Sequence, residues 1–110
     1  MSSKLEAALE AALVAAPDLR GWEREFRAVP ARRFRWDFAF PASRLLIEVQ
    51  GGIYGGKGAH TGANLPRDYE KLNLATIHGY RSLMFGPRDL SKRAMPDTLD
   101  TIRMALLAPR

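Results

Sequence analysis

The sequence contains no cysteine, which excludes disulfide bonds, cysteine-ligated zinc and a thiol nucleophile. It has no apolar run that approaches the length of a membrane span. Glu6 and Glu10 interrupt the apolar N-terminal stretch that a secretory signal would need. No repeat, linker, helix-turn-helix, zinc-finger or P-loop pattern is present. These absences favour a soluble cytoplasmic protein with no membrane partner and no nucleotide cofactor.

Arginine is abundant and unevenly placed. The 110 residues suit a single domain, 1–110, and carry a formal charge of +5 with a pI near 10.1. A polyanion, and nucleic acid in particular, is the partner that such a surface favours, although a basic surface without a partner also fits. The arginines that crowd the first half of the chain are Arg20, Arg24, Arg27, Arg32, Arg33, Arg35 and Arg44.

The hydrophobic periodicity and the turn residues predict an α/β fold. The expected elements are a helix over 3–15, strands over 22–29, 34–40 and 44–50, a helix over 66–78, a strand over 80–85 and a helix over 96–107. The second and third strands read as a hairpin, because only Pro41, Ala42 and Ser43 separate them. A strand–helix–strand step after the hairpin predicts a mixed sheet with helices packed against it.

Strand alternation gives each face of the predicted hairpin a different character. One face of 34–40 carries Phe34, Trp36, Phe38 and Phe40, and the other carries Arg33, Arg35, Asp37 and Ala39. In 44–50 the faces carry Leu45, Ile47 and Val49 on one side, and Leu46, Glu48 and Gln50 on the other. If the two strands pair, Asp37 and Glu48 lie close together on one face of the sheet.

Two neighbouring carboxylates are hard oxygen ligands of the kind that Mg²⁺ or Mn²⁺ prefers. Arg33 and Arg35, predicted on the same face, suit phosphates beside such an ion. A divalent ion with a nearby phosphate is the arrangement that phosphodiester hydrolysis uses. Taken singly, Asp37 and Glu48 also fit the solvated face of an antiparallel strand.

Two short stretches of the sequence resemble a known family. The stretches "RWDF" (35–38) and "LLIEVQGG" (45–52) resemble the PD-(D/E)XK nuclease superfamily. Among its members the chain looks most like small phage and archaeal-type Holliday junction resolvases, and very-short-patch repair endonucleases are also similar. The resemblance covers about residues 3–90 and implies an αβββαβ restriction-endonuclease-like core, to which this chain adds a C-terminal helix. A phage-encoded member would act in the host cytoplasm.

The resemblance also implies roles for individual residues. Asp37 and Glu48 match the two metal-binding acids, and the carbonyl of Val49 would join them around Mg²⁺, with Mn²⁺ as an alternative. Gln50 stands where the family usually has lysine, and glutamine supplies no positive charge. Lys71 is our first choice for a lysine that replaces the missing one, and Lys57 is the second. Lys71 also fits an ordinary helix-surface charge.

Further residues complete the predicted site. First helices in the family often contribute a glutamate, for which Glu6 is preferred to Glu10, although the position of Glu6 also fits a capping box with Ser3. His60, in the glycine-rich segment, could contact a phosphate or help to activate water, or have no such task. The residues expected to bind DNA are Arg32, Arg33, Arg35, Lys57 and Arg67.

The function implied is a metal-dependent endodeoxyribonuclease that resolves four-way DNA junctions. Two symmetric cuts in a junction call for two identical subunits, so a homodimer is expected. Two rivals remain open: an endonuclease that nicks mismatched or flapped duplex, and a catalytically inactive module that binds nucleic acid. A small structural domain with an incidental basic surface is a third, weaker alternative.

Overall fold

The computed structural model describes residues 3–51 and 65–109, which form three helices around a four-stranded sheet. The elements follow the chain as α1 (Lys4–Val14), β1 (Glu23–Phe26), β2 (Trp36–Phe40), β3 (Leu45–Val49), α2 (Leu65–Ile77), β4 (Arg81–Phe85) and α3 (Met95–Leu107). A 3₁₀ turn, Pro41–Ser43, joins β2 to β3. The predicted order of elements is confirmed over the described residues. None of the helices described there is long and apolar enough to cross a bilayer.

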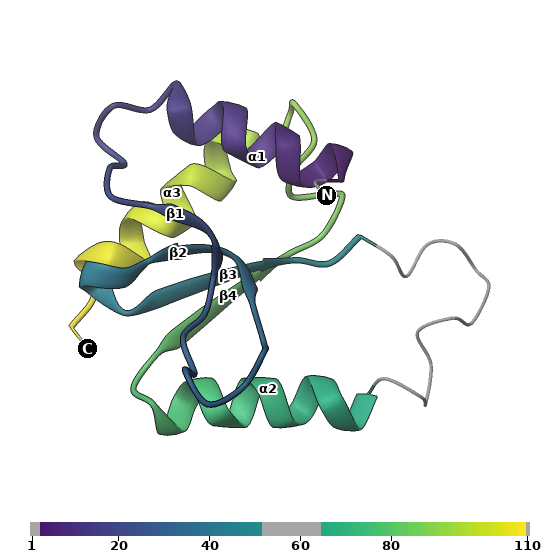
Figure 1. Cartoon of the computed structure of the whole chain (residues 1–110). Coiled ribbons are helices and arrows are strands. Elements are labelled where there is room, and N and C mark those ends of the chain that lie inside the picture. The colour runs from purple at the N-terminus through teal and green to yellow at the C-terminus, as the bar shows by residue number, and fades with distance from the viewer. Residues whose placement is uncertain (1–2, 52–64, 110) are drawn as a thin grey trace.

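The sheet is mixed, as predicted. Its strand order is β1-β2-β3-β4, in which the first three strands are antiparallel and β4 runs parallel to β3. The connection between the parallel strands contains α2, as such a crossover requires. Helices α1 and α3 cover one face of the sheet and α2 covers the other (Figure 1). The protein is therefore a three-layer α/β fold.

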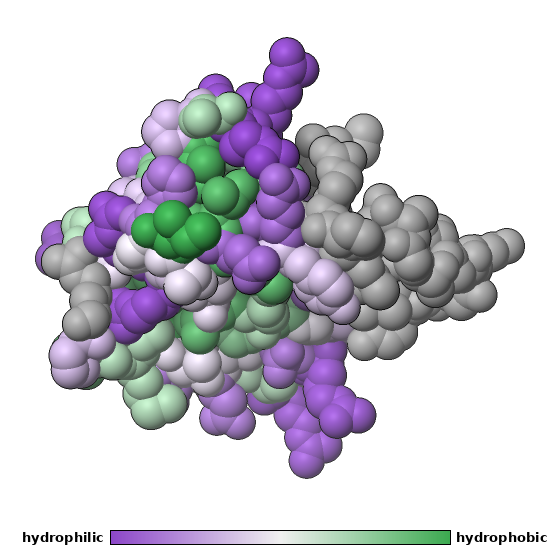
Figure 2. All heavy atoms as spheres, turned by 90° about the horizontal axis from the view of Figure 1, so that it is seen from below, coloured by the Kyte–Doolittle hydropathy of each residue, from purple (hydrophilic) through white to green (hydrophobic). Residues whose placement is uncertain are grey.

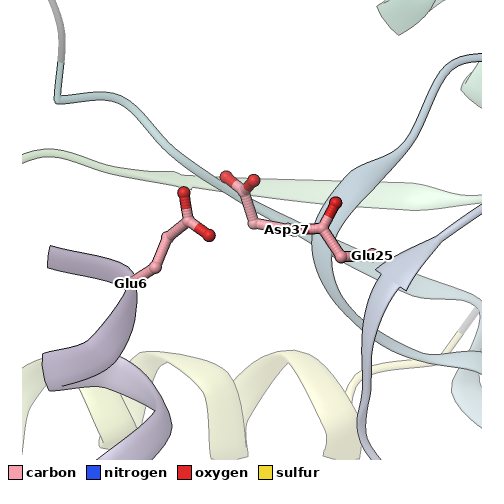
Figure 3. Close-up of side chains that lie close together, drawn as sticks. All are labelled: Glu6, Glu25 and Asp37. Carbon is pink, nitrogen blue, oxygen red and sulfur yellow. The ribbon is translucent and has the colours of Figure 1, made fainter. Parts of the chain in front are cut away.

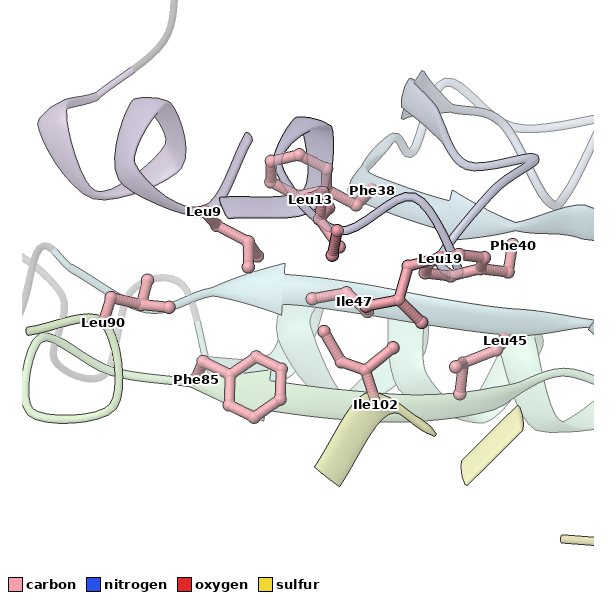
Figure 4. Packing of buried hydrophobic residues seen from close by; sticks show 11 residues of the cluster. Leu9, Leu13, Leu19, Phe38, Phe40, Leu45, Ile47, Phe85, Leu90 and Ile102 are labelled. Atoms are coloured by element: carbon pink, nitrogen blue, oxygen red, sulfur yellow. The ribbon is translucent and has the colours of Figure 1, made fainter. Parts of the chain in front are cut away.

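Two hydrophobic clusters hold these layers together. In the first, Leu9 and Leu13 of α1 pack with Phe38, Ile47 and Ile102, all almost fully buried, between the sheet and the helices α1 and α3 (Figure 4). These leucines are four residues apart and belong to the hydrophobic periodicity that predicts the first helix. Burial of each large apolar side chain contributes roughly 1.5–3 kcal/mol.

The second cluster lies on the opposite face of the sheet. Trp36, Ala39 and Leu46 pack there with Ala75 of α2. Both faces of β2 and β3 are therefore covered along most of their length, which is why their burial is nearly continuous. The polar residues of these strands are Asp37, near the beginning of β2, and Glu48, near the end of β3.

Helix α1 begins with the predicted N-cap. The backbone N–H of Glu6 donates to the hydroxyl of Ser3 at 3.1 Å. The carboxylate of Glu6 is used differently from a capping box, because it accepts a hydrogen bond from Arg24 at 2.6 Å instead. The side chain of Glu6 thus ties the helix to β1.

Two predicted strands begin later or end earlier than expected. The first strand covers only Glu23–Phe26, and Ala28 and Val29 are buried outside it. The second strand begins at Trp36, so Arg33 and Arg35 precede it and do not share a sheet face with Asp37. The prediction of an arginine-lined sheet face is therefore wrong. Both arginines lie in the connection that leads from β1 to β2.

The predicted alternation of aromatic residues in β2 is also wrong at one position. Trp36 belongs to the cluster on the α2 side, whereas Phe38 belongs to the cluster on the α1 side. The change of face occurs at Asp37, opposite Glu25 of β1, whose φ of 51° lies in the left-handed region. This conformation costs a non-glycine residue about 1–2 kcal/mol, and such strain is commonly found at functional sites. The irregular point of the sheet thus coincides with two acidic side chains.

Candidate active site

The two predicted acids lie side by side at the point where β2 and β3 separate. The ladder pairs Phe38 with Ile47, which leaves Asp37 opposite Glu48 just beyond the last pair. There, Glu48 Oε1 accepts a hydrogen bond from the backbone N–H of Asp37 at 3.2 Å. In return, Asp37 Oδ2 accepts from the backbone N–H of Val49 at 2.7 Å. Each carboxylate therefore takes the place of a ladder hydrogen bond. The two acids are neighbours, as predicted, but the prediction that they share one face of the sheet is wrong, because Asp37 turns toward α1 and Glu48 toward α2.

The two carboxylates reach toward different helices. Asp37 lies with Glu6 of α1 and Glu25 of β1, whose carboxylate oxygens come within 4.8 Å of one another (Figure 3). Glu48 instead contacts Lys71 of α2, with 2.5 Å between Oε2 and Nζ. The site, called the gap below, is thus the end of the β2–β3 ladder, with acidic groups from three elements on the α1 side and an ion pair on the α2 side.

One arginine runs along the acidic side of this gap. Arg24 donates to Glu6 and to Glu10, each at 2.6 Å, and to the backbone carbonyl of Asp37 at 3.0 Å. Its guanidinium lies 3.7 Å from the carboxylate of Glu25. One positive charge is therefore shared by an acidic neighbourhood whose formal negative charge exceeds it.

The electrostatics of Glu6 reflect this excess. Burial raises the pKa of the Glu6 carboxyl above its usual value, and the negative charge of Asp37 raises it further, while Arg24 acts in the opposite direction. A divalent cation would relieve the same repulsion. The donor set, which consists of carboxylate oxygens, is the one that Mg²⁺ and Mn²⁺ prefer. The residues present therefore fit such an ion, and Asp37 would be its central ligand.

Lys71 lies on the other side of the gap. Its Nζ donates to Glu48 Oε2 at 2.5 Å and to the backbone carbonyl of Arg35 at 2.6 Å, and it lies 4.8 Å from the ring centroid of Trp36. The side chains of Lys71 and Glu48 are 18% and 15% exposed. Burial raises the pKa of Glu48 to about 7, against the opposing attraction of Lys71. A largely buried ion pair with a shifted pKa, as Glu48 and Lys71 form here, often marks an active site.

The backbone of Val49 also faces the gap. The N–H of Gln50 donates to Phe85 of β4 at 2.8 Å, whereas the N–H of Val49 donates to Asp37. In an extended strand the N–H and C=O of one residue point to the same side, and successive residues alternate. The carbonyl of Val49 is therefore directed toward β2, on the side of Asp37, where the resemblance places a metal ligand.

Other predicted residues are placed less favourably. Gln50 is exposed beside β4, with its amide nitrogen 3.7 Å from the sulfur of Met84. Glu10 is paired with Arg24 and is not part of the three-acid cluster. Arg32 is paired with Glu70 of α2 at 2.6 Å, which fastens the β1–β2 connection to that helix. Lys57 and His60 lie outside the described residues, as does the side chain of Arg67, which belongs to the first turn of α2.

Glu25 and the bridging role of Arg24 were missed from sequence. The signal for Glu25 was its register, because a first strand paired antiparallel with the second places Glu25 directly opposite Asp37. That register could not be fixed from an alternation as weak as that of residues 22–29. Its left-handed backbone could not be predicted either, because position 25 holds a glutamate and not glycine or asparagine, which adopt this conformation readily.

The buried carboxyl of Glu48 makes the stability of the fold dependent on pH. Its pKa of about 7 in the folded protein exceeds the ordinary value of 4.5, so the folded state loses stability as pH rises from below 4.5 through 7. Glu48→Gln removes this titration. We expect chemical denaturation to show that the variant gains about 2 kcal/mol relative to wild type between pH 5 and pH 8. Glu23→Gln, a change at an exposed position of β1, should show no such gain, and equal behaviour of the two variants would contradict the burial effect.

Taken together, the gap combines hard oxygen ligands, a lysine within contact of one of them and a directed backbone carbonyl. Such a set can bind a divalent cation and present a positive charge to an anionic substrate.

Comparisons with protein-family models, with curated proteins and with solved structures found no match for this chain.

Proposed function

We propose that this protein is a metal-dependent DNA endonuclease of the PD-(D/E)XK type. The observation that carries the proposal is the meeting of Asp37, Glu48 and Lys71, which come from β2, β3 and α2 and are joined by direct hydrogen bonds. The order of elements, with α1 and α2 on opposite faces of a mixed sheet, is the one that the resemblance implies (Figure 1). Lys71 supplies the positive charge that Gln50 lacks.

Asp37, Glu48 and the carbonyl of Val49 would hold Mg²⁺, or Mn²⁺ in its place, with Glu6 and Glu25 adding negative charge beside Asp37. When bound, the ion lowers the pKa of a water molecule and neutralises charge that develops on the phosphate. Hydrolysis joins the water oxygen to phosphorus and breaks the bond to the leaving sugar oxygen. The protein residues position these partners.

Lys71 has a direct part in this positioning. Its ammonium group has three N–H donors, of which Glu48 Oε2 and the carbonyl of Arg35 accept two. The third can donate to the attacking water or to a phosphate oxygen, where a fixed positive charge stabilises the transition state. The ring of Trp36 packs beside Nζ and keeps the group in place.

The preferred substrate in this proposal is a four-way DNA junction. A single domain with arginine-rich connections suits recognition of phosphates and of DNA shape better than reading of base edges. The two symmetric cuts that resolve a junction require two copies of the site, so the active form is proposed to be a homodimer. The alternative of a catalytically inactive binding module is favoured by the absence of a lysine at position 50. The position of Lys71 beside Glu48 weakens that alternative.

A panel of synthetic four-way, mismatched, flapped and linear DNAs, incubated with Mg²⁺, tests the proposal. We expect the wild-type protein to cut the four-way junction fastest. Glu48→Gln should bind this DNA normally and fail to cut it, because the amide cannot replace the carboxylate as a ligand. Preferential cutting of mismatched or flapped duplex would favour the nicking endonuclease, and equal cutting by Glu48→Gln would contradict the proposed site.

A further inference from the structure

The connection between β1 and β2 forms a basic feature, separate from the acidic gap. A pocket of about 410 Å³ lies there, and the described residues that line it are Arg27, Arg33 and Arg35. In Figure 1 this connection descends from the sheet toward α2, to which the Arg32–Glu70 ion pair fastens it. The face seen from the α2 side mixes hydrophilic residues with smaller hydrophobic areas (Figure 2).

The three pocket arginines differ in their partners from Arg24, Arg32 and Arg103. Arg24, Arg32 and Arg103 each form ion pairs with carboxylates at 2.6–2.7 Å. Within the described part of the chain, no carboxylate pairs with any of the three that line the pocket. Three guanidinium groups around one hollow repel one another, and an anion placed between them would relieve that repulsion.

The pocket is shaped in part by the backbone. Arg27 Nη2 donates to the carbonyls of Pro30 and Arg32, each at 2.9 Å, which fixes this guanidinium against the connection. Its remaining N–H groups can still donate to a ligand. A guanidinium with a fixed plane favours bidentate binding of phosphate oxygens. One wall of the pocket is thus already ordered for an oxyanion.

The pocket adjoins the candidate active site. The carbonyl of Arg35 accepts the hydrogen bond from Lys71 Nζ at 2.6 Å, and Asp37 follows only two residues later. Two residues of extended chain span about 7 Å. An anion held by Arg35 would therefore lie close to the phosphate that faces Asp37 and Lys71.

We propose that Arg27, Arg33 and Arg35 bind a backbone phosphate of the DNA strand that is cut, next to the scissile phosphate. The identity of the ligand as DNA rests on the proposed function, whereas the unpaired charges rest on the structure alone. A nucleic-acid strand fits better than a small anion, because its successive phosphates can fill the pocket and the gap at once. This pocket would set the register of the strand in the active site.

Binding of a fluorescent four-way junction, measured by anisotropy with Ca²⁺ over a series of salt concentrations, tests the pocket. Arg33→Gln and Arg35→Gln should each weaken binding by about tenfold and lower the slope of log K against log salt by about one. Arg93→Gln removes the same charge from an exposed site before α3 and serves as the matched control. Its effect should stay within about twofold. Thermal unfolding of each variant shows whether the fold is intact.

Neutral phosphates locate the contact on the DNA. Junctions with a single methylphosphonate, moved along the strand near the cut, should include one position that weakens wild-type binding but does not weaken Arg35→Gln further. The pocket proposal is overturned if the arginine variants behave like Arg93→Gln, or if no position shows this coupling. Stronger binding of an RNA strand than of DNA, with the same coupling, would overturn DNA as the ligand.

Cleavage measured on the same samples with Mg²⁺ separates this proposal from the nuclease proposal. If the wild-type protein cuts nothing and the arginine variants still weaken binding, the phosphate pocket stands and the nuclease proposal fails. If the wild-type protein cuts DNA and the arginine variants bind as it does, the nuclease proposal stands and the pocket fails.

Discussion

Asp37→Asn should reduce the rate of Mg²⁺-dependent DNA cleavage by about 10³-fold or more. Among the described carboxylates, Asp37 is the one that adjoins both parts of the site, since it lies within 4.8 Å of Glu6 and Glu25 and accepts from the backbone of Val49 beside Glu48. A bound ion contributes several kcal/mol of transition-state stabilisation, and each 1.36 kcal/mol corresponds to a factor of ten in rate. Single-turnover cleavage with saturating protein measures the chemical step directly.

Asp97→Asn is the matched control for this substitution. It removes the same charge from an exposed position in the first turn of α3, on the far side of the first hydrophobic cluster from α2. This variant should cut at the wild-type rate. In Asp37→Asn the new amide oxygen can still accept a hydrogen bond from the N–H of Val49, so DNA binding and thermal stability should change little. A fall of less than about tenfold in the rate of Asp37→Asn would contradict its role as the central ligand.

Lys71→Met should reduce cleavage by about 10²–10³-fold, and Gln50→Lys in the same protein should restore part of the loss. Methionine keeps an unbranched side chain one atom shorter and removes the charge that lies 2.5 Å from Glu48. Position 50 follows Glu48 by two residues, so a lysine there can reach the gap from β3. We expect the double variant to cut at least about tenfold faster than Lys71→Met.

Two controls separate catalysis from electrostatics in this experiment. Lys92→Met removes an exposed charge before α3 and should leave cutting unchanged. If Lys71 acted only by keeping Glu48 ionised, the rate of Lys71→Met would rise toward the wild-type rate as pH increases, because Lys71 lowers the pKa of Glu48. We expect the defect to persist as pH increases instead. Cutting by Lys71→Met within about twofold of wild type at neutral pH would contradict any role of the lysine.

The fold could be predicted in outline because its strongest signals are local. The apolar stripe of Leu9 and Leu13 and the N-cap at Ser3 defined α1, and the short turn at Pro41–Ser43 defined the β2–β3 hairpin. The face of Trp36 could not be predicted, because strand alternation fails at Asp37, opposite the left-handed backbone of Glu25. Such a conformation results from tertiary contacts and not from the residue itself.

The site was predicted where strand periodicity decides geometry, and missed where long-range contacts decide it. Strand pairing was enough to bring Asp37 beside Glu48. The contact of Lys71 with Glu48 depends on how α2 packs on the sheet, which the sequence suggested only through the family resemblance. Arg33 and Arg35 were expected beside Asp37 on the sheet, but they lie in the connection before β2, because the strand begins only at Trp36.

Anomalous X-ray diffraction from crystals grown with Mn²⁺ and a bound DNA junction would locate the metal ion. We expect an anomalous peak in contact with the Asp37 carboxylate, in the gap between β2 and β3, and loss of this peak in crystals of Asp37→Asn. Crystals that contain ordered DNA and Mn²⁺ but show no peak at Asp37 would contradict the claim that this gap is a metal-dependent active site.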